Sequence, residues 1–161
     1  MSSIGIRLAS LALLAVTACA SESDSSAPAP PAPETLFDTL PAATPDKLRG
    51  VWQSTQTQTN GTVEVRLRFT DSYLVGAAKC VANGSDTPVI AGSTIGLDTT
   101  ALDAATGKLT IAALSMQKQE GNLVCQAGVP GNTYDFTIAD GTLSLAVGDA
   151  KLNTSFTKVG D

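Results

Sequence analysis

The strongest pattern along the chain is an alternation of hydrophobic and polar residues, which is typical of β-strands. Residues 63–69 alternate strictly, so that Val63, Val65, Leu67 and Phe69 share one face and charged residues share the other. The segments 134–138 and 143–147 repeat this pattern. Weaker strand patterns cover 50–57, 72–82, 89–97, 108–117, 122–129 and 151–159. The alternation therefore predicts an all-β domain of eight or nine strands.

Turn signals between the strands favour an antiparallel order. Turn dipeptides that contain glycine separate several of the strands, and Asp140-Gly141 is a typical hairpin turn. No stretch between strands is long enough for the crossover that parallel neighbours need. An antiparallel meander removes its exposed edges by closing on itself. We therefore expect a small up-and-down barrel over residues 47–161, a length sufficient for one core. Another antiparallel sandwich or barrel is the alternative.

The segment that enters the first strand has the signals of a short helix. Residues 44–50 carry a threonine cap, a proline at the first helical position, an acidic residue, two basic residues and a closing glycine. The chain then continues as Gly50-Val51-Trp52. A short helix followed by Gly-x-Trp, with Gly50 and Trp52 at the matching positions, resembles the opening of lipocalin-like domains.

The lipocalin resemblance implies that the helix plugs one barrel end and that Trp52 packs over the bottom of the core. The family also places an arginine near the last strand on this tryptophan. No arginine follows Arg68 here, so Lys151 or Lys158 would have to take that place. The resemblance further implies a ligand site inside the barrel, although a filled core would require the same inward residues. The candidate lining residues are Val65, Leu67, Phe69, Tyr134 and Phe136.

The first residues resemble an export signal that ends in a lipid attachment site. The apolar stretch 8–18 is shorter than the roughly 20 residues that a transmembrane helix needs. It leads into Val16-Thr17-Ala18-Cys19, which resembles the lipobox of bacterial lipoproteins. A plain secretory signal, cut near Ala18 or Ala20 with Cys19 incidental, is the alternative.

The lipoprotein resemblance implies that residues 1–18 are a signal peptide and that the Cys19 thiol receives a diacylglycerol through a thioether. The new amine would also be acylated, and two or more chains anchor a protein stably. In this family an Asp just after the cysteine often retains the protein in the inner membrane, and Ala20 stands there instead. We therefore expect an exported, membrane-anchored protein, in the outer membrane rather than the inner one.

Residues 19–46 have the composition of a linker. The part rich in Ser and Asp predicts a flexible coil, and the part rich in Ala and Pro predicts a stiffer spacer. Residues 34–40 can form one helical turn with a small apolar patch. That turn would be transient, rest against the domain, or bind a partner.

Cys80 and Cys125 are the two cysteines left for the domain once Cys19 is lipidated. In an exported protein such a pair predicts a disulfide. A redox pair usually has Cys-x-x-Cys spacing, and a zinc site needs four ligands, which this chain without histidine does not supply. We therefore expect a structural disulfide between two strands.

Composition and charge exclude further classes of function. The chain has 10 basic and 15 acidic residues, a net charge of −5, and no histidine. Nucleic-acid binding needs clustered Lys and Arg, and histidine is the usual general base and metal ligand. Asp98 and Asp103 lack the EF-hand spacing, so a solvated loop is expected there. We expect no enzyme, no metal site, no cofactor and no nucleic-acid partner.

Two functional classes remain for the anchored domain. In the first, the barrel is a binding module for a small apolar or lipidic ligand. In the second, it is a structural or protein-interaction lipoprotein of the cell envelope with a filled core and an unknown protein partner. The volume enclosed by the barrel distinguishes a barrel with a ligand cavity from a barrel with a filled core.

Overall fold

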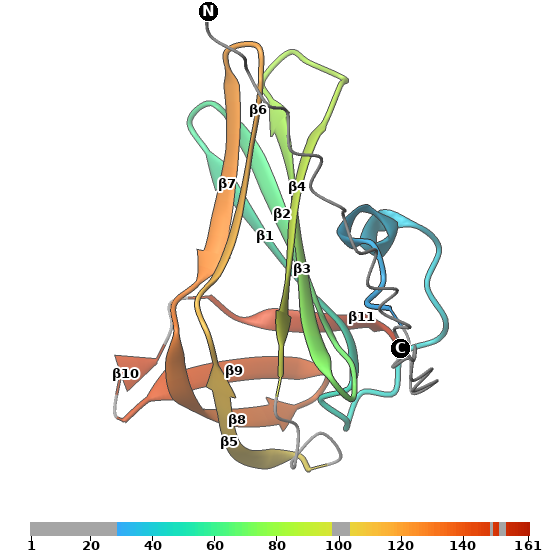
Figure 1. Ribbon diagram of the computed structural model, residues 1–161, viewed down its shortest axis with the longest axis vertical. Helices are drawn as coiled ribbons and strands as arrows, with labels where there is room; N and C mark the ends of the chain where they lie inside the picture. Colours follow the sequence, from blue (N-terminus) through green and yellow to red (C-terminus); the bar gives the residue numbers. More distant parts are fainter. Residues whose placement is uncertain (1–28, 98–103, 149, 152–153) are drawn as a thin grey trace, which may run out of the picture.

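The alternating segments form antiparallel strands that curl strongly into a half-barrel (Figure 1). The computed structural model describes residues 29–97, 104–148, 150–151 and 154–161. Eight strands of the main sheet follow one another in the order β4-β3-β2-β1-β11-β9-β8-β5, and β10 pairs with β9 beside this path. The expected all-β class and antiparallel pairing are thus confirmed.

The element bounds lie close to the predicted strands. The strands are β1 (Gly50–Gln58), β2 (Gly61–Phe69), β3 (Tyr73–Ala82), β4 (Val89–Gly96), β5 (Thr106–Ile111), β6 (Leu114–Glu120), β7 (Leu123–Val129), β8 (Asn132–Ala139), β9 (Thr142–Val147), β10 (Ala150–Lys151) and β11 (Phe156–Gly160). The predicted segment 108–117 contains parts of two strands, because the chain breaks its ladder between β5 and β6. The predicted last strand is divided into β10 and β11.

One long hairpin is shared between two sheets. Its lower half pairs β5 with β8 inside the main sheet, and its upper half pairs β6 with β7 as a separate two-stranded sheet. Pro130-Gly131 interrupts the strand between β7 and β8, where proline removes a ladder donor. Figure 1 shows the β6–β7 hairpin rising beside β1–β4, while β8, β9 and β11 cross below them.

The half-barrel is not closed by a continuous ladder. Its end strands β4 and β5 pair with one another nowhere in the described residues, so the sheet remains open where a complete barrel would be sealed. Instead, β6 runs close to β4, and its Leu114 and Met116 side chains approach Gly76 of β3. Side-chain packing therefore holds the hairpin over the inner face of the sheet.

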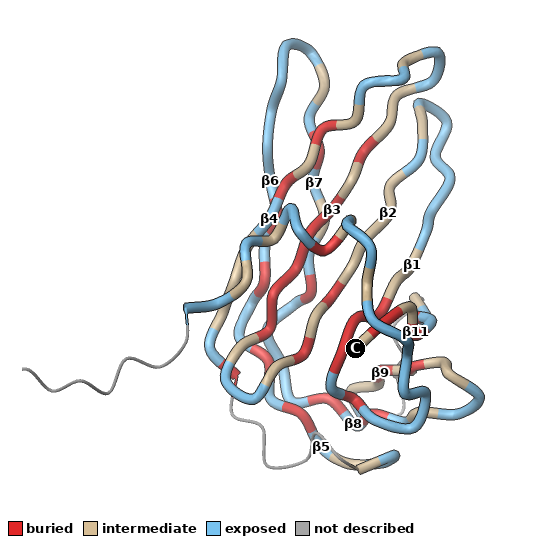
Figure 2. The backbone as a smooth tube through the Cα atoms, turned by 90° about the vertical axis from the view of Figure 1, so that its right-hand side faces the viewer, coloured by how far each residue is buried: buried red, intermediate tan, exposed pale blue. Residues whose placement is uncertain are grey.

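The inward residues of both sheets meet in one hydrophobic core. Trp52, Leu67, Phe69, Tyr134 and Phe136 are among its fully buried side chains. Figure 2 shows that buried positions gather along the middle and lower parts of the strands, whereas the hairpin tips above them are exposed. The core therefore fills the base of the half-barrel and thins out towards the open upper end.

A short N-terminal helical turn is present, as expected, and it is the 3₁₀-helix η1 at Pro33–Phe37. The position predicted for it, residues 44–50, is wrong, because residues 44–49 form turns and bends and Gly50 already begins β1. Long-range side-chain bonds hold this segment, since Lys158 Nζ donates to the carbonyls of Lys47 and Arg49. Trp52 Nε1 donates to the carbonyl of Leu48 at 2.7 Å. A single turn fixes several residues for one backbone hydrogen bond, so these side-chain bonds from β1 and β11 decide the conformation of the segment.

Residues 33–40, here called the strap, rest against the domain, which is one of the three alternatives for this turn. Leu36 is fully buried on the outer face of the sheet, together with Val51, Val75 and Ala77. Phe37, in the same strap, packs at the edge of this second cluster. This part of the segment expected to be a linker is therefore packed on the fold.

A basic clamp fixes the strap. Arg66 Nη1 donates to the Leu36 carbonyl at 2.7 Å, and its guanidinium carbon lies 5.1 Å from the centre of the Phe37 ring. Lys79 Nζ lies 5.7 Å from the same centre. Both distances suit cation–π contacts. The strap is therefore held by apolar burial and by two cations.

The strap also depends on a glycine in β4. A Cβ atom on Gly92 would lie 2.2 Å from the Pro33 Cβ atom, which is a severe overlap. We expect Gly92→Val to displace the strap while leaving the sheet folded, because valine suits a strand. Limited proteolysis should then cut within residues 29–46 about tenfold faster, since protection follows the free energy of local opening.

The control for that experiment is Gly96→Val in the same strand, where a Cβ atom would meet nothing within 4 Å. It adds the same side chain to β4 without touching the strap. Equal cleavage rates for wild type, Gly92→Val and Gly96→Val would contradict a strap held by close packing at Gly92.

Candidate functional site

The ligand-lining residues predicted from the sequence mostly fill the core. Leu67, Phe69, Tyr134 and Phe136 are 0–1% exposed and belong to one cluster of touching side chains. The Tyr134 hydroxyl donates to the Pro130 carbonyl at 2.7 Å, and burial raises the pKa of this phenol. Val65 differs, because it is only partly buried and faces an open groove.

The Gly-x-Trp motif sits at the base of the fold beside a buried lysine. Lys158 Nζ lies 5.0 Å from the centre of the Trp52 rings, and the Lys158 side chain is 1% exposed. Lys158, one of the two lysines expected near this tryptophan, therefore contacts it, whereas the side chain of Lys151 lies outside the described residues. Gly50 has a φ of +113°, and a Cβ atom on it would lie 2.6 Å from the Gly160 carbonyl oxygen, so the motif needs glycine at this position.

The Lys158 charge is balanced by oxygen atoms around it. The carbonyls of Lys47 and Arg49 accept its hydrogen bonds, and Asp161 Oδ1 lies 3.3 Å from Nζ. Burial lowers the pKa of Lys158, and Asp161 partly offsets this effect. Burial opposes ionisation of Asp161, but hydrogen bonds from Thr44 and the contact with Lys158 outweigh it, so the Asp161 pKa is lowered. This satisfied arrangement is structural in character.

Cys80 and Cys125 form a disulfide that joins β3 to β7. Their Cα atoms are 5.5 Å apart, a separation usual for such bonds, and both residues are buried. The bond ties the separate β6–β7 sheet to the main sheet at β3.

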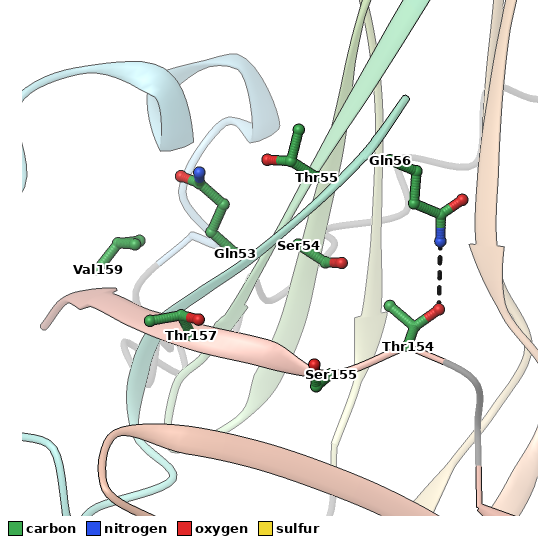
Figure 3. A pocket seen from close by; sticks show the side chains of 8 residues that line it. All are labelled: Gln53, Ser54, Thr55, Gln56, Thr154, Ser155, Thr157 and Val159. Carbon is green, nitrogen blue, oxygen red and sulfur yellow. Dashed lines mark hydrogen bonds between the residues drawn. The ribbon is translucent and has the colours of Figure 1, made fainter. Parts of the chain in front are cut away.

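A gap in the backbone ladder lies beside the second half of β1. β11 pairs with β1 at Val51, Trp52 and Gln53, and no later residue of β1 has a ladder partner on that side in the described chain. Where the two strands diverge, Gln56 Nε2 donates to Thr154 Oγ1 at 3.2 Å. A side-chain bond thus stands where the backbone ladder has ended, as Figure 3 shows.

Hollows lie on both faces of this gap. The outer hollow, drawn in Figure 3, has a volume of about 560 Å³. It is lined by Gln53, Ser54, Thr55, Gln56, Thr154, Ser155, Thr157 and Val159. The inner groove, between β1–β2 and β7, has a volume of about 210 Å³. Ser54, Gln56 and Thr154 line both, so the two hollows meet at the Gln56–Thr154 bond.

The inner groove is more apolar than the outer hollow. Val63, Val65, Ala127, Val129 and Phe156 contribute to its walls. It shares Val63, Gln58 and Gln126 with a further hollow that continues towards the tip of the β6–β7 hairpin. At that tip Val124 is the large hydrophobic residue with the greatest exposure, at 48%.

The chemistry of the gap suits binding. Neither hollow is lined by Asp, Glu, Lys, Arg or Cys in the described part of the chain, so its polar groups are neutral amides and hydroxyls. Such groups donate and accept hydrogen bonds but do not titrate near neutral pH. The described residues also contain no group of three or more possible metal ligands.

Several sequence predictions concern residues outside the ranges that the structure describes. The lipidation candidate Cys19 and the loop residues Asp98 and Asp103 lie outside the described residues. So does the signal segment 1–18. Within the described ranges, no helix is long and apolar enough to cross a membrane.

Sequence reasoning missed the gap, although β1 carried a signal for it. Ser54, Gln56 and Gln58 share a strand face with Trp52, yet they are polar. The inward alternation therefore stops after Trp52, which indicates that the second half of this strand does not face a closed core.

Comparisons with protein families, curated proteins and solved structures give no match for this chain, so the functional argument rests on its own geometry.

Proposed function

We propose that this chain is a lipid-anchored, non-catalytic interaction protein of a bacterial cell envelope. Its lipocalin-like half-barrel would bind a protein partner at the gap beside β1. The Trp52–Lys158 contact supports the lipocalin resemblance, because it reproduces a cation on the motif tryptophan. The sequence around Cys19 supports the anchor, and Ala20 supports the outer membrane.

The observation that carries the proposal is that the domain's own side chains fill its interior. Four of the five candidate lining residues, Leu67, Phe69, Tyr134 and Phe136, are buried against one another in the core cluster. Small-molecule sites usually offer about 300–1,000 Å³. The inner groove that Val65 faces offers only about 210 Å³, and the larger outer hollow of about 560 Å³ is polar and lies at the surface. The geometry therefore favours a surface contact over an enclosed apolar ligand.

The anchor is tested by labelling bacterial cells that express the full chain with radioactive palmitate. We expect label on the wild type and none on Cys19→Ala, because a thioether lipid and its amide partner both require that residue. The wild type should sediment with membranes, and the variant should not. Label retained by Cys19→Ala would contradict the proposed attachment site.

A second experiment, on the purified full chain, distinguishes an interaction protein from a small-ligand carrier. Organic extraction followed by mass spectrometry should recover the covalent anchor after hydrolysis but no free apolar compound at about one equivalent per chain. Extraction from Cys19→Ala provides the control without an anchor. A stoichiometric apolar compound in both extracts would instead support a small-ligand carrier.

A further inference from the structure

The edge of β1 beyond Gln53, here called the free edge, presents backbone groups that have no ladder partner among the described residues. From Ser54 to Gln58, β1 is paired with β2 on one side and with no described residue on the other. An antiparallel ladder uses the N–H and C=O groups of alternate residues on each side. The edge from Ser54 to Gln58 therefore offers the hydrogen-bonding template that an added strand requires.

The residues of this edge lack the charges and prolines that commonly prevent strand addition. Natural edges are commonly protected by lysine, proline or inward-pointing charges. The edge segment reads Ser54-Thr55-Gln56-Thr57-Gln58, which contains no charged residue and no proline. Its β-branched threonines also favour an extended backbone. The sequence thus leaves the edge open to a partner strand.

The two hollows lie where the side chains of an added strand would go. Successive side chains of a strand point to opposite faces of its sheet. The outer hollow of about 560 Å³ and the inner groove of about 210 Å³ lie on opposite faces of the gap and meet at Gln56. An extended segment beside β1 would therefore find space for its side chains on both faces.

We propose that the free edge of β1 binds one extended, uncharged peptide segment of a protein partner as an additional strand. This inference rests on the proposed function and specifies its partner. Backbone hydrogen bonds to Ser54–Gln58 would supply the general affinity, as in other cases of strand addition. The Gln56–Thr154 bond would open, and both side chains could then bond the peptide.

The linings of the two hollows define the side chains of that segment. The inner groove has Val63, Val65 and Phe156 in its walls, which suits small apolar residues. The outer hollow has Gln53, Thr55 and Thr157, which suits small polar residues. Because neither lining supplies a charged group, a charged side chain would lose hydration without gaining an ionic partner. Alternating valine and threonine satisfies both faces.

The probe is the labelled peptide acetyl-Thr-Val-Thr-Val-Thr-Val-Thr-amide, titrated by fluorescence anisotropy into the full chain in detergent. Its matched control carries N-methyl groups on alternate residues, which keeps the side chains but removes the pairing edge. We expect the N-methyl peptide to bind at least about tenfold more weakly. Equal binding of both peptides, or no saturable binding of the first, overturns the proposal.

Two variants locate the peptide on the molecule. Ala127→Trp fills the inner groove, which Ala127 lines, and is expected to weaken binding about tenfold or more. Ala139→Trp adds the same side chain at an exposed position at the end of β8 and should leave the affinity unchanged. Equal weakening by both variants, or by neither, overturns the proposed position.

Hydrogen exchange on the wild type supplies a test that needs no variant. Binding of the unmodified peptide should slow exchange of amides in residues 54–58, and the N-methyl peptide should not.

Sedimentation of the unliganded chain tests for the competing occupant, a second copy of the protein. A dimer that Ala127→Trp dissociates would overturn the proposal in favour of self-association. A failure of peptide binding leaves the palmitate and extraction results intact, so the two proposals fail separately.

Discussion

Replacing Trp52 with alanine is expected to lower the free energy of unfolding by about 3–5 kcal/mol, the usual range for removing a large buried aromatic side chain. Trp52 is fully buried, and it joins the core to the turns at residues 44–49 through its bond to the Leu48 carbonyl. A small domain has about 5–15 kcal/mol of stability in total. The variant should therefore unfold at a much lower urea concentration, which equilibrium unfolding measures directly.

Two further variants divide this loss into its parts. Trp52→Phe keeps an aromatic ring near Lys158 but removes the indole donor to the Leu48 carbonyl, so an intermediate loss is expected. Lys158→Met removes the ammonium and deprives the carbonyls of Lys47 and Arg49 of their donor, for which about 1–3 kcal/mol is expected.

A double-mutant cycle between Trp52 and Lys158 measures their coupling. A cation over a buried aromatic ring contributes about 0.5–2 kcal/mol, so the two single losses should not add. Additive losses would show that the contact of 5.0 Å carries no coupling energy. Exposed Lys118, which pairs with Glu120 on the surface, provides a control substitution that should change stability little.

Much of the strand order could be predicted from sequence because burial in a sheet has a period of two. The segment 63–69 places Leu67 and Phe69 in the core and Arg66 on the other face, and β2 contains this segment. Asp140-Gly141 connects β8 and β9, which pair through Ala139 and Thr142. These signals are local, so they can be recognised in the sequence without knowledge of the tertiary fold.

The errors arose where distant residues decide local structure. The turns at 44–49 are held by a distant side chain, since Lys158, more than a hundred residues later in the chain, donates to the carbonyls of Lys47 and Arg49. The strap was not assigned to the domain because its pocket is built by Gly92 and by residues such as Val75. Neither relation leaves a periodic signal near the residues concerned.

The same distinction applies to the candidate site. The pairing of Cys80 with Cys125 follows from the small number of cysteines, so sequence sufficed to predict it. The gap beside β1 depends on where β11 turns away after pairing with Gln53, which no local pattern reports. The gap is reflected in the sequence only by polar residues at inward positions, Ser54 and Gln56, in the half of β1 that is accessible to solvent on both faces.

Removing the disulfide by Cys80→Ala together with Cys125→Ala is expected to lower the free energy of unfolding by about 4 kcal/mol, the chain-entropy value for a bridge across 45 residues. The bond connects β7 to β3, and the β6–β7 sheet has no ladder to the main sheet in the described chain. Urea unfolding in a Cys19→Ala background, where no other thiol remains, measures the loss.

The effect should also be uneven along the long hairpin. Its lower half is secured by the ladders of β8 with β5 and β9, whereas its upper half depends on side-chain packing and on the disulfide. Hydrogen exchange should therefore accelerate more in Leu123–Val129 than in Asn132–Ala139. Reducing agent should reproduce the change in the parent protein and have no effect on the double variant. Uniform acceleration through both strands would mean that the bond stabilises the domain as one cooperative unit, with no separate hold on the β6–β7 hairpin.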